Sequence, residues 1–71
     1  MMHEILRLHE NLQEDETLII YSLVGVDTTV SANDFLIAKN NVLVIRRQNG
    51  AVTVLNPDWI IKCRTYGGIL L

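Results

Sequence analysis

The spacing of apolar residues near the start of the chain predicts an amphipathic helix. Met1, Ile5 and Leu8 recur at the spacing of one helical face, and polar side chains fill most positions between them. We therefore expect a helix over residues 1–13 that lies over an open end or a face of a β-sheet. The acidic run at residues 14–16 fits a connecting loop, because carboxylates are unfavourable at the negative end of a helix dipole.

Short runs of β-branched and aliphatic residues make up most of the remaining chain and predict strands. The expected strands are Thr17–Val24, Thr28–Ala38, Val42–Arg47, Ala51–Leu55 and Trp59–Tyr66. The start of the second strand is left open, since residues 31–34 fit a loop, a bulge or the beginning of a bent strand. The first strand is apolar on both faces, so we expect its second face to meet the helix or another subunit.

Turn residues separate these strands at short intervals. Asn49-Gly50 predicts a tight hairpin, because a primed turn needs positive φ at both central positions. The run at residues 39–41 predicts a second short turn, since asparagine tolerates left-handed backbone. Proline 57 has no N–H to donate, so it ends the fourth strand just before the last one begins.

These elements together predict a single mainly β domain. Its N-terminal α-helix precedes a strongly bent five-stranded antiparallel sheet over residues 17–66, which forms a small open barrel. Residues 67–71 form an apolar tail that either frays or docks on a neighbour, and its composition favours docking. With 49% hydrophobic residues in 71, the chain is more apolar than a solitary domain of this size needs, which indicates burial against other subunits.

Composition narrows the classes of function. The longest mainly apolar run is far shorter than the roughly 20 residues of a membrane span, and no signal-peptide pattern is present, so we expect a cytoplasmic protein with no membrane partner. Cys63 is the sole cysteine, and His3 and His9 point to different sides of the expected helix, so no disulfide, metal site or cofactor is expected. The absence of a catalytic motif or phosphate loop predicts a non-enzymatic protein without a small-molecule substrate.

The two halves of the chain differ in charge. Residues 1–34 hold seven acids and one base, whereas residues 35–71 hold five bases and one acid. This asymmetry favours attraction between neighbouring subunits, or it leaves one basic surface for an anionic partner.

The order of one helix, a five-strand meander and a very tight turn before the last strand resembles the Sm-like family of ring-forming RNA-binding proteins. The resemblance implies that strands four and five of adjacent subunits pair to close a ring, and that the turn at residues 56–58 carries one of two RNA-binding loops. A rival resemblance, to small flagellar and phage-borne β proteins with the same Asn-Gly and Asn-Pro-Asp order, implies no RNA binding.

Basic and amide side chains in the second half supply candidate RNA contacts, because lysine and arginine attract phosphate and asparagine pairs with base edges. The candidates are Lys39, Asn40, Asn41, Asn56, Lys62 and Arg64. The asparagines equally suit ordinary turns. The cations, with Arg46 and Arg47 beside them, equally suit pairing with the acidic half of a neighbour. The aromatic residues Tyr21, Phe35, Trp59 and Tyr66 stack on bases or belong to the core or an interface.

Apolar residues of the last two strands and the tail are the candidate subunit interface. They are Val52, Val54, Ile60, Tyr66 and Leu70. We therefore expect a non-enzymatic, ring-forming homo-oligomer that binds single-stranded RNA weakly. The alternative is a structural or protein-interaction accessory module of the phage or mobile-element type, without nucleic-acid binding.

Overall fold

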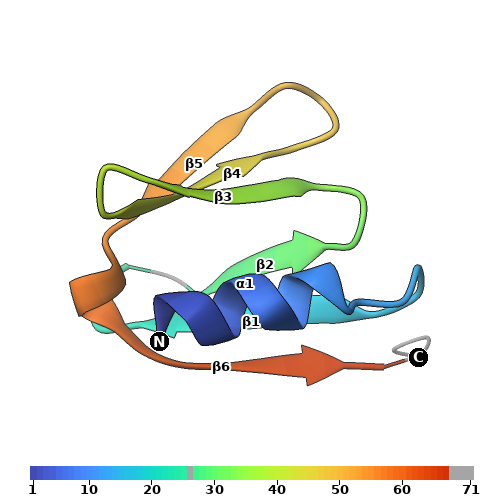
Figure 1. Cartoon of the computed structure of the whole chain (residues 1–71), viewed down its shortest axis with the longest axis horizontal. Coiled ribbons are helices and arrows are strands. Elements are labelled where there is room, and N and C mark those ends of the chain that lie inside the picture. Colours follow the sequence, from blue (N-terminus) through green and yellow to red (C-terminus); the bar gives the residue numbers. More distant parts are fainter. Residues whose placement is uncertain (26, 68–71) are drawn as a thin grey trace.

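One α-helix and six strands form the described part of the chain, residues 1–25 and 27–67, in a computed structural model (Figure 1). The elements are α1 (Met2–Glu10), β1 (Thr17–Ser22), β2 (Thr28–Ser31), β3 (Phe35–Lys39), β4 (Val42–Arg46), β5 (Val52–Leu55), the 3₁₀ helix η1 (Pro57–Trp59) and β6 (Ile60–Tyr66). The strands form two antiparallel sheets, sheet A in the order β2-β1-β6 and sheet B in the order β3-β4-β5, which do not close into a barrel. The prediction of a mainly β fold behind an N-terminal helix is confirmed.

The number of strands differs from the prediction. The expected strand Thr28–Ala38 is two strands, β2 and β3, and the turn between them separates sheet A from sheet B. Ser31 and Asp34 close this turn, because the Asp34 N–H donates to the Ser31 carbonyl at 3.2 Å and the Ser31 N–H donates to Asp34 Oδ2 at 3.1 Å. A short polar side chain thus gives the backbone a local alternative to the sheet ladder. A single five-stranded bent sheet is not found.

The helix packs its apolar stripe on the core between the two sheets. Ile5 is fully buried, and the buried strand residues that surround it are Leu18, Ile20, Val30, Leu36, Leu43 and Ile45. The predicted amphipathic helix is confirmed, but it ends at Glu10 rather than at residue 13. Asn11 ends it, since its backbone N–H and its side-chain amide both donate to the Arg7 carbonyl, at 3.2 and 2.9 Å. Leu12 lies beyond the helix and still packs against the core.

Strand β1 is buried on one face only. Leu18 and Ile20 are fully buried, whereas Ile19 and Tyr21 on the opposite face are half-buried. Leu23, expected within this strand, lies beyond its end and is 70% exposed. The helix therefore covers the inner face of sheet A, and no described element covers its outer face.

The two hairpin turns of sheet B have different backbone geometries, and the primed turn is not the one that was predicted. Asn40 and Asn41 both adopt positive φ, +52° and +63°, as a primed two-residue turn requires. Of Asn49 and Gly50, only Gly50 does, at +90°. The expected primed turn at Asn49-Gly50 is therefore wrong. The Gly50 N–H donates to the Arg47 carbonyl at 3.0 Å, which makes this a three-residue loop that ends in a left-handed glycine.

Proline 57 ends β5 as predicted. Asn56 caps the following 3₁₀ turn, because its Oδ1 accepts the Asp58 N–H at 2.9 Å. The last strand then begins at Ile60, one residue later than expected. Within the described residues no helix is long and apolar enough to cross a membrane.

Candidate nucleic-acid interface

The outer face of sheet A carries two tyrosines and two cations in contact. Tyr21 on β1 lies opposite Lys62 on β6, and Lys62 Nζ is 5.1 Å from the centroid of the Tyr21 ring. Arg64 Cζ is 4.4 Å from the centroid of the Tyr66 ring on the same strand. Both distances are within the range of cation–π attraction. We call these four residues the tyrosine–cation cluster.

The two phenols of the cluster join β1 to β6. The Tyr21 and Tyr66 hydroxyl oxygens are 3.4 Å apart, at the long end of hydrogen-bond distance. This hydrogen bond, followed by partial desolvation, raises the pKa of Tyr21 above its usual 10.0. The Tyr21 phenol is therefore neutral near pH 7, while Lys62 and Arg64 are exposed to solvent beside the rings. Neutral aromatic rings beside exposed cations offer stacking and phosphate contact on one surface.

The turn at Lys39, Asn40 and Asn41 lies elsewhere. All three residues are exposed, and the two asparagines provide the positive φ of the turn. Figure 1 places this turn at the same end of the molecule as η1, with Asn56 at its start, whereas Lys62 and Arg64 lie along β6. The six predicted RNA-contacting residues therefore divide between two regions. One is an asparagine-bearing end and the other is the tyrosine–cation cluster.

Arg46 and Arg47 have different surroundings although they are adjacent. Arg47 Nη1 donates to Asp34 Oδ2 at 3.1 Å and also to the Thr29 carbonyl, so it ties the start of the β4–β5 loop to the turn between the sheets. Arg46 is exposed on the outer face of sheet B. Arg47 is therefore a structural residue, whereas the Arg46 side chain is exposed and makes no ion pair within the described residues.

A polar network holds the corner where the two sheets meet. His9 Nε2 lies 3.0 Å from the Ser31 carbonyl, which requires the proton on that nitrogen. Partial burial alone would raise the pKa of Asp34, but hydrogen bonds from the Ser31 backbone and from Arg47 outweigh it, so the pKa lies below its usual 3.8. The Asp34–Arg47 pair thus stays ionised at neutral pH. We call Asp34, Arg47 and Ser31 the corner clamp.

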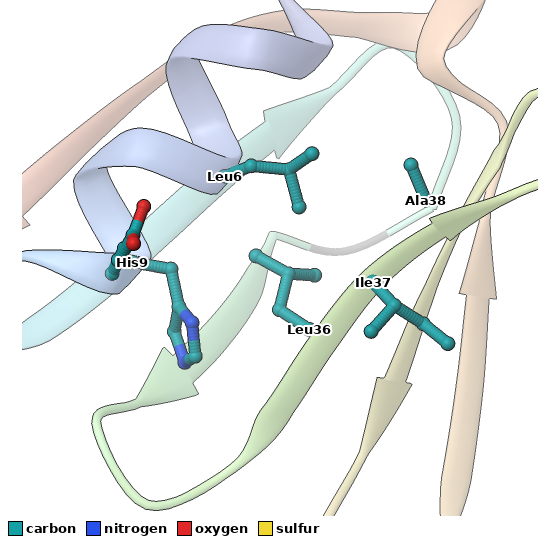
Figure 2. Close-up of a pocket in the computed structure, with 6 residues that line it drawn as sticks. Leu6, His9, Leu36, Ile37 and Ala38 are labelled. Carbon is teal, nitrogen blue, oxygen red and sulfur yellow. The ribbon is translucent and has the colours of Figure 1, made fainter.

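A hollow lies between α1 and β3 (Figure 2). Its volume is about 450 Å³, and its lining residues are Leu6, His9, Glu10, Leu36, Ile37 and Ala38. Figure 2 shows Leu6 and Leu36 pointing into the space between the two elements and Ile37 pointing away from the helix. No serine, threonine, cysteine or lysine lines it, and no group of three His, Cys, Asp or Glu side chains suited to a metal occurs in the described residues.

The single thiol fits a packing role. Cys63 is half-buried against the core. Burial, followed by the charge of Glu4, raises the pKa of its thiol above the usual 9.0. The thiolate that a nucleophile needs is therefore scarce at neutral pH.

The predicted interface residues do not share one surface. Val52 and Val54 are exposed on the outer face of sheet B, whereas Ile60 packs against the core of its own chain. Tyr66 belongs to the tyrosine–cation cluster. Leu70 lies outside the described residues.

The sequence predicted that Lys62 and Arg64 share one face of the last strand, but it did not predict that Tyr21 and Tyr66 lie beside them. Tyr21 and Tyr66 are 45 residues apart, and only the register of β1 against β6 brings them together. The signal was the alternation along the last strand, which places residues 62, 64 and 66 on one face. Comparisons with protein-family models, with curated proteins and with solved structures find no match for this chain.

Proposed function

We propose that this chain is a non-enzymatic, homo-oligomeric domain of Sm-like architecture that binds single-stranded RNA weakly. The observation that carries the RNA proposal is the tyrosine–cation cluster. Sheet surfaces that bind single strands combine aromatic side chains, on which bases stack, with cations that neutralise phosphates. Lys39, Asn40, Asn41 and Asn56 are the further proposed contacts, and the protein is proposed to act in the cytoplasm.

The strand order supports the architectural part of the proposal. Sheet A has the order β6-β1-β2 and sheet B continues it as β3-β4-β5. If β2 and β3 are counted as the two halves of one bent strand, the order is that of an Sm-like meander. The last strand then lies beside the first, and β5 and β6 remain as free edges.

The free edges support assembly. β5 and β6 are edge strands of different sheets, and unpaired edges are templates for pairing with another chain. In the Sm-like family the corresponding strands of adjacent subunits pair to close a ring. We propose the same pairing here, with exposed Val52 and Val54 flanking the contact. Size-exclusion chromatography with light scattering tests it, and a purely monomeric protein at micromolar concentration would contradict it.

The RNA proposal is tested by fluorescence anisotropy with labelled 12-nucleotide A-rich and U-rich RNA. Lys62→Ala and Arg64→Ala should each weaken binding and reduce the salt dependence, because each removes one phosphate contact. Arg7→Ala is the matched control, since it removes an exposed cation from α1. An affinity that does not fall as salt rises, or that falls equally in all three variants, would exclude this surface as the RNA site.

A second candidate function is a structural or protein-interaction accessory module. The observation that favours it is the exposure of Phe35, Ile37, Val52 and Val54 on the outer face of sheet B. Large exposed apolar patches on small domains mark interaction sites. Under this proposal the triple variant with alanine at Lys39, Lys62 and Arg64 keeps full function, whereas a polar substitution at Phe35 removes it.

A further inference from the structure

The outer face of sheet B is an ordered apolar surface. The register sets Phe35, Arg46 and Val52 side by side in one row across the three strands. The next row is Ile37, Val44 and Val54. Five of these six side chains are apolar, and we call the six residues the sheet B face.

The exposure of this face is larger than scattered surface residues require. Phe35 is 69% exposed and Val54 is 59% exposed. Ile37 and Val52 are 49% and 55% exposed, so four neighbouring apolar side chains are exposed together, and the largest exposed apolar patch of a monomer is often functional. The helix packs on the opposite, inner side of the sheets, so no described element covers the face.

A small hollow lies within the sheet B face. Phe35, Ile37 and Val44 form its apolar walls, Arg46 lines it as well, and its volume is about 90 Å³. A cavity of roughly 150 Å³ accommodates a benzene ring, so this one suits a single aliphatic side chain. The ion pair that occurs within the described residues is made by Arg47 with Asp34, which leaves the Arg46 guanidinium available to an outside carboxylate.

Charge decides which occupant fits. Lys39 continues the same face one row beyond Ile37, so the described residues of this surface include two cations and no carboxylate. A second copy that presents the same face would bring further cations and no carboxylate for Arg46, and like charges within one interface are unfavourable. A lipid surface would use the apolar area but not a hollow sized for one side chain. A protein partner that brings a carboxylate next to an aliphatic side chain suits both the cations and the hollow.

We propose that the sheet B face binds a peptide segment of another protein that presents an aliphatic side chain next to an aspartate or glutamate. The aliphatic side chain fills the hollow between Phe35, Ile37 and Val44. The carboxylate pairs with Arg46, whose planar guanidinium binds carboxylates through two parallel hydrogen bonds. Apolar anchors with a central arginine are the residues that usually dominate protein interfaces. This inference deepens the second candidate function and does not depend on RNA binding.

The test is selection of peptides on the immobilised full chain from a phage-displayed library of random 12-residue peptides. The expected result is enrichment of sequences with Leu, Ile or Val adjacent to Asp or Glu. A synthetic peptide of that sequence should bind at least tenfold more weakly to Arg46→Glu and to Phe35→Ser, measured by fluorescence anisotropy. Both positions are exposed, and circular dichroism checks that the variants fold. Arg64→Glu makes the same charge change on sheet A and should alter binding less than twofold.

A charge swap sharpens the test. Replacing the peptide carboxylate by lysine should abolish binding to the wild-type chain and restore it for Arg46→Glu. Enrichment of basic peptides, or of apolar peptides indifferent to Arg46, overturns the inference while leaving an interaction function in place. If the chain dimerises and Phe35→Ser abolishes the dimer, the face binds a second copy. If the chain floats with vesicles of 70% phosphatidylcholine and 30% phosphatidylserine and Phe35→Ser abolishes flotation, the face binds a membrane. No enrichment, no dimer and no flotation overturn both the inference and the second candidate function.

Discussion

Replacing Asp34 by alanine should destabilise this domain more than replacing an exposed acidic residue by alanine. The Asp34 side chain is only 9% exposed, and its Oδ2 accepts hydrogen bonds from the Ser31 N–H and from Arg47 Nη1, each at 3.1 Å. Alanine would leave a backbone donor without its partner at the turn and Arg47 without its counter-ion. The variant therefore breaks the corner clamp, which holds sheet B against sheet A.

The magnitude follows from the two lost bonds. A hydrogen bond to a charged group contributes about 1.5–3 kcal/mol to stability. Arg47 is 26% exposed, so solvent screens part of the ion pair and the combined loss should be about 2–4 kcal/mol. A domain of 71 residues has a free energy of unfolding of about 4–10 kcal/mol, so the variant loses a large fraction of it.

Urea unfolding followed by circular dichroism measures the effect. Asp34→Asn keeps an acceptor for the Ser31 N–H but loses the charge, so it should lose less than Asp34→Ala. Asp15→Ala removes an exposed acid from the loop before β1 and should change the free energy of unfolding by less than about 0.5 kcal/mol. If Asp34→Ala is no less stable than Asp15→Ala, the clamp does not stabilise the corner.

The same residue predicts a pH dependence. Because the pKa of Asp34 is lower in the folded protein than its usual 3.8, the folded state favours the ionised carboxylate. Its contribution is fully present above the unfolded pKa and is lost as the pH falls through the lower folded pKa. Wild-type stability should therefore decline below about pH 4, and Asp34→Asn should show a shallower decline in that window. Equal slopes for the two proteins would contradict the assigned pKa shift.

Three further predictions concern other parts of the fold. Leu43→Ala, at a fully buried position of β4, should lose about 2–5 kcal/mol of unfolding free energy in urea, whereas Ile37→Ala on the exposed face should lose much less. Asn41→Ala should lower the free energy of unfolding by roughly 1 kcal/mol and Asn41→Gly should change it little, because φ of residue 41 is +63° and only glycine adopts such a φ without steric cost. Equal thermal midpoints for the two variants would show that residue 41 is not strained. Cys63 should react with a disulfide reagent more slowly than free cysteine at pH 8, and the reaction rate should still rise above pH 9, because burial raises the pKa of the thiol. A reaction as fast as that of free cysteine would contradict the burial of Cys63.

Local patterns were sufficient to predict most elements of the fold. The helix follows from the apolar spacing around Ile5, and the positions of the strands follow from β-branched runs that turn residues interrupt, although several strand ends differ from the prediction by one or two residues. The break between β2 and β3 at residues 32–34 does not follow from local sequence alone, because its cause is partly remote. Asp34 closes the turn locally, but the arginine that holds it lies 13 residues away. The Asn49-Gly50 turn was predicted with the wrong geometry, since Asn49 uses its side chain to accept the Ala51 N–H at 3.0 Å.

The candidate site was predictable only in its cations. Alternation along a strand places Lys62 and Arg64 on one face, whatever the strand pairs with. The rings beside them depend on the pairing of β1 with β6, which is a long-range register that no local pattern specifies. The sheet B face could not be predicted from the sequence for a similar reason. Phe35 fits base stacking, the core or an interface in the sequence, and Val52 fits a subunit interface. Only the position of β4 between them shows that both side chains share one face, opposite the buried Leu43 and Ile45.

The two outer faces carry different chemistry, and this separates the two proposed functions. Sheet A presents tyrosines and cations, whereas sheet B presents a mainly apolar surface with one arginine in its first row. The sheets are joined at the corner clamp and share the core, so a clamp or core variant should weaken both functions through stability. A surface variant on one sheet should leave the other face intact, because distant and independent sites behave additively. Arg64→Glu and Arg46→Glu make the same charge change on opposite sheets, and if each impaired both RNA and peptide binding equally, net charge rather than either surface would explain the loss.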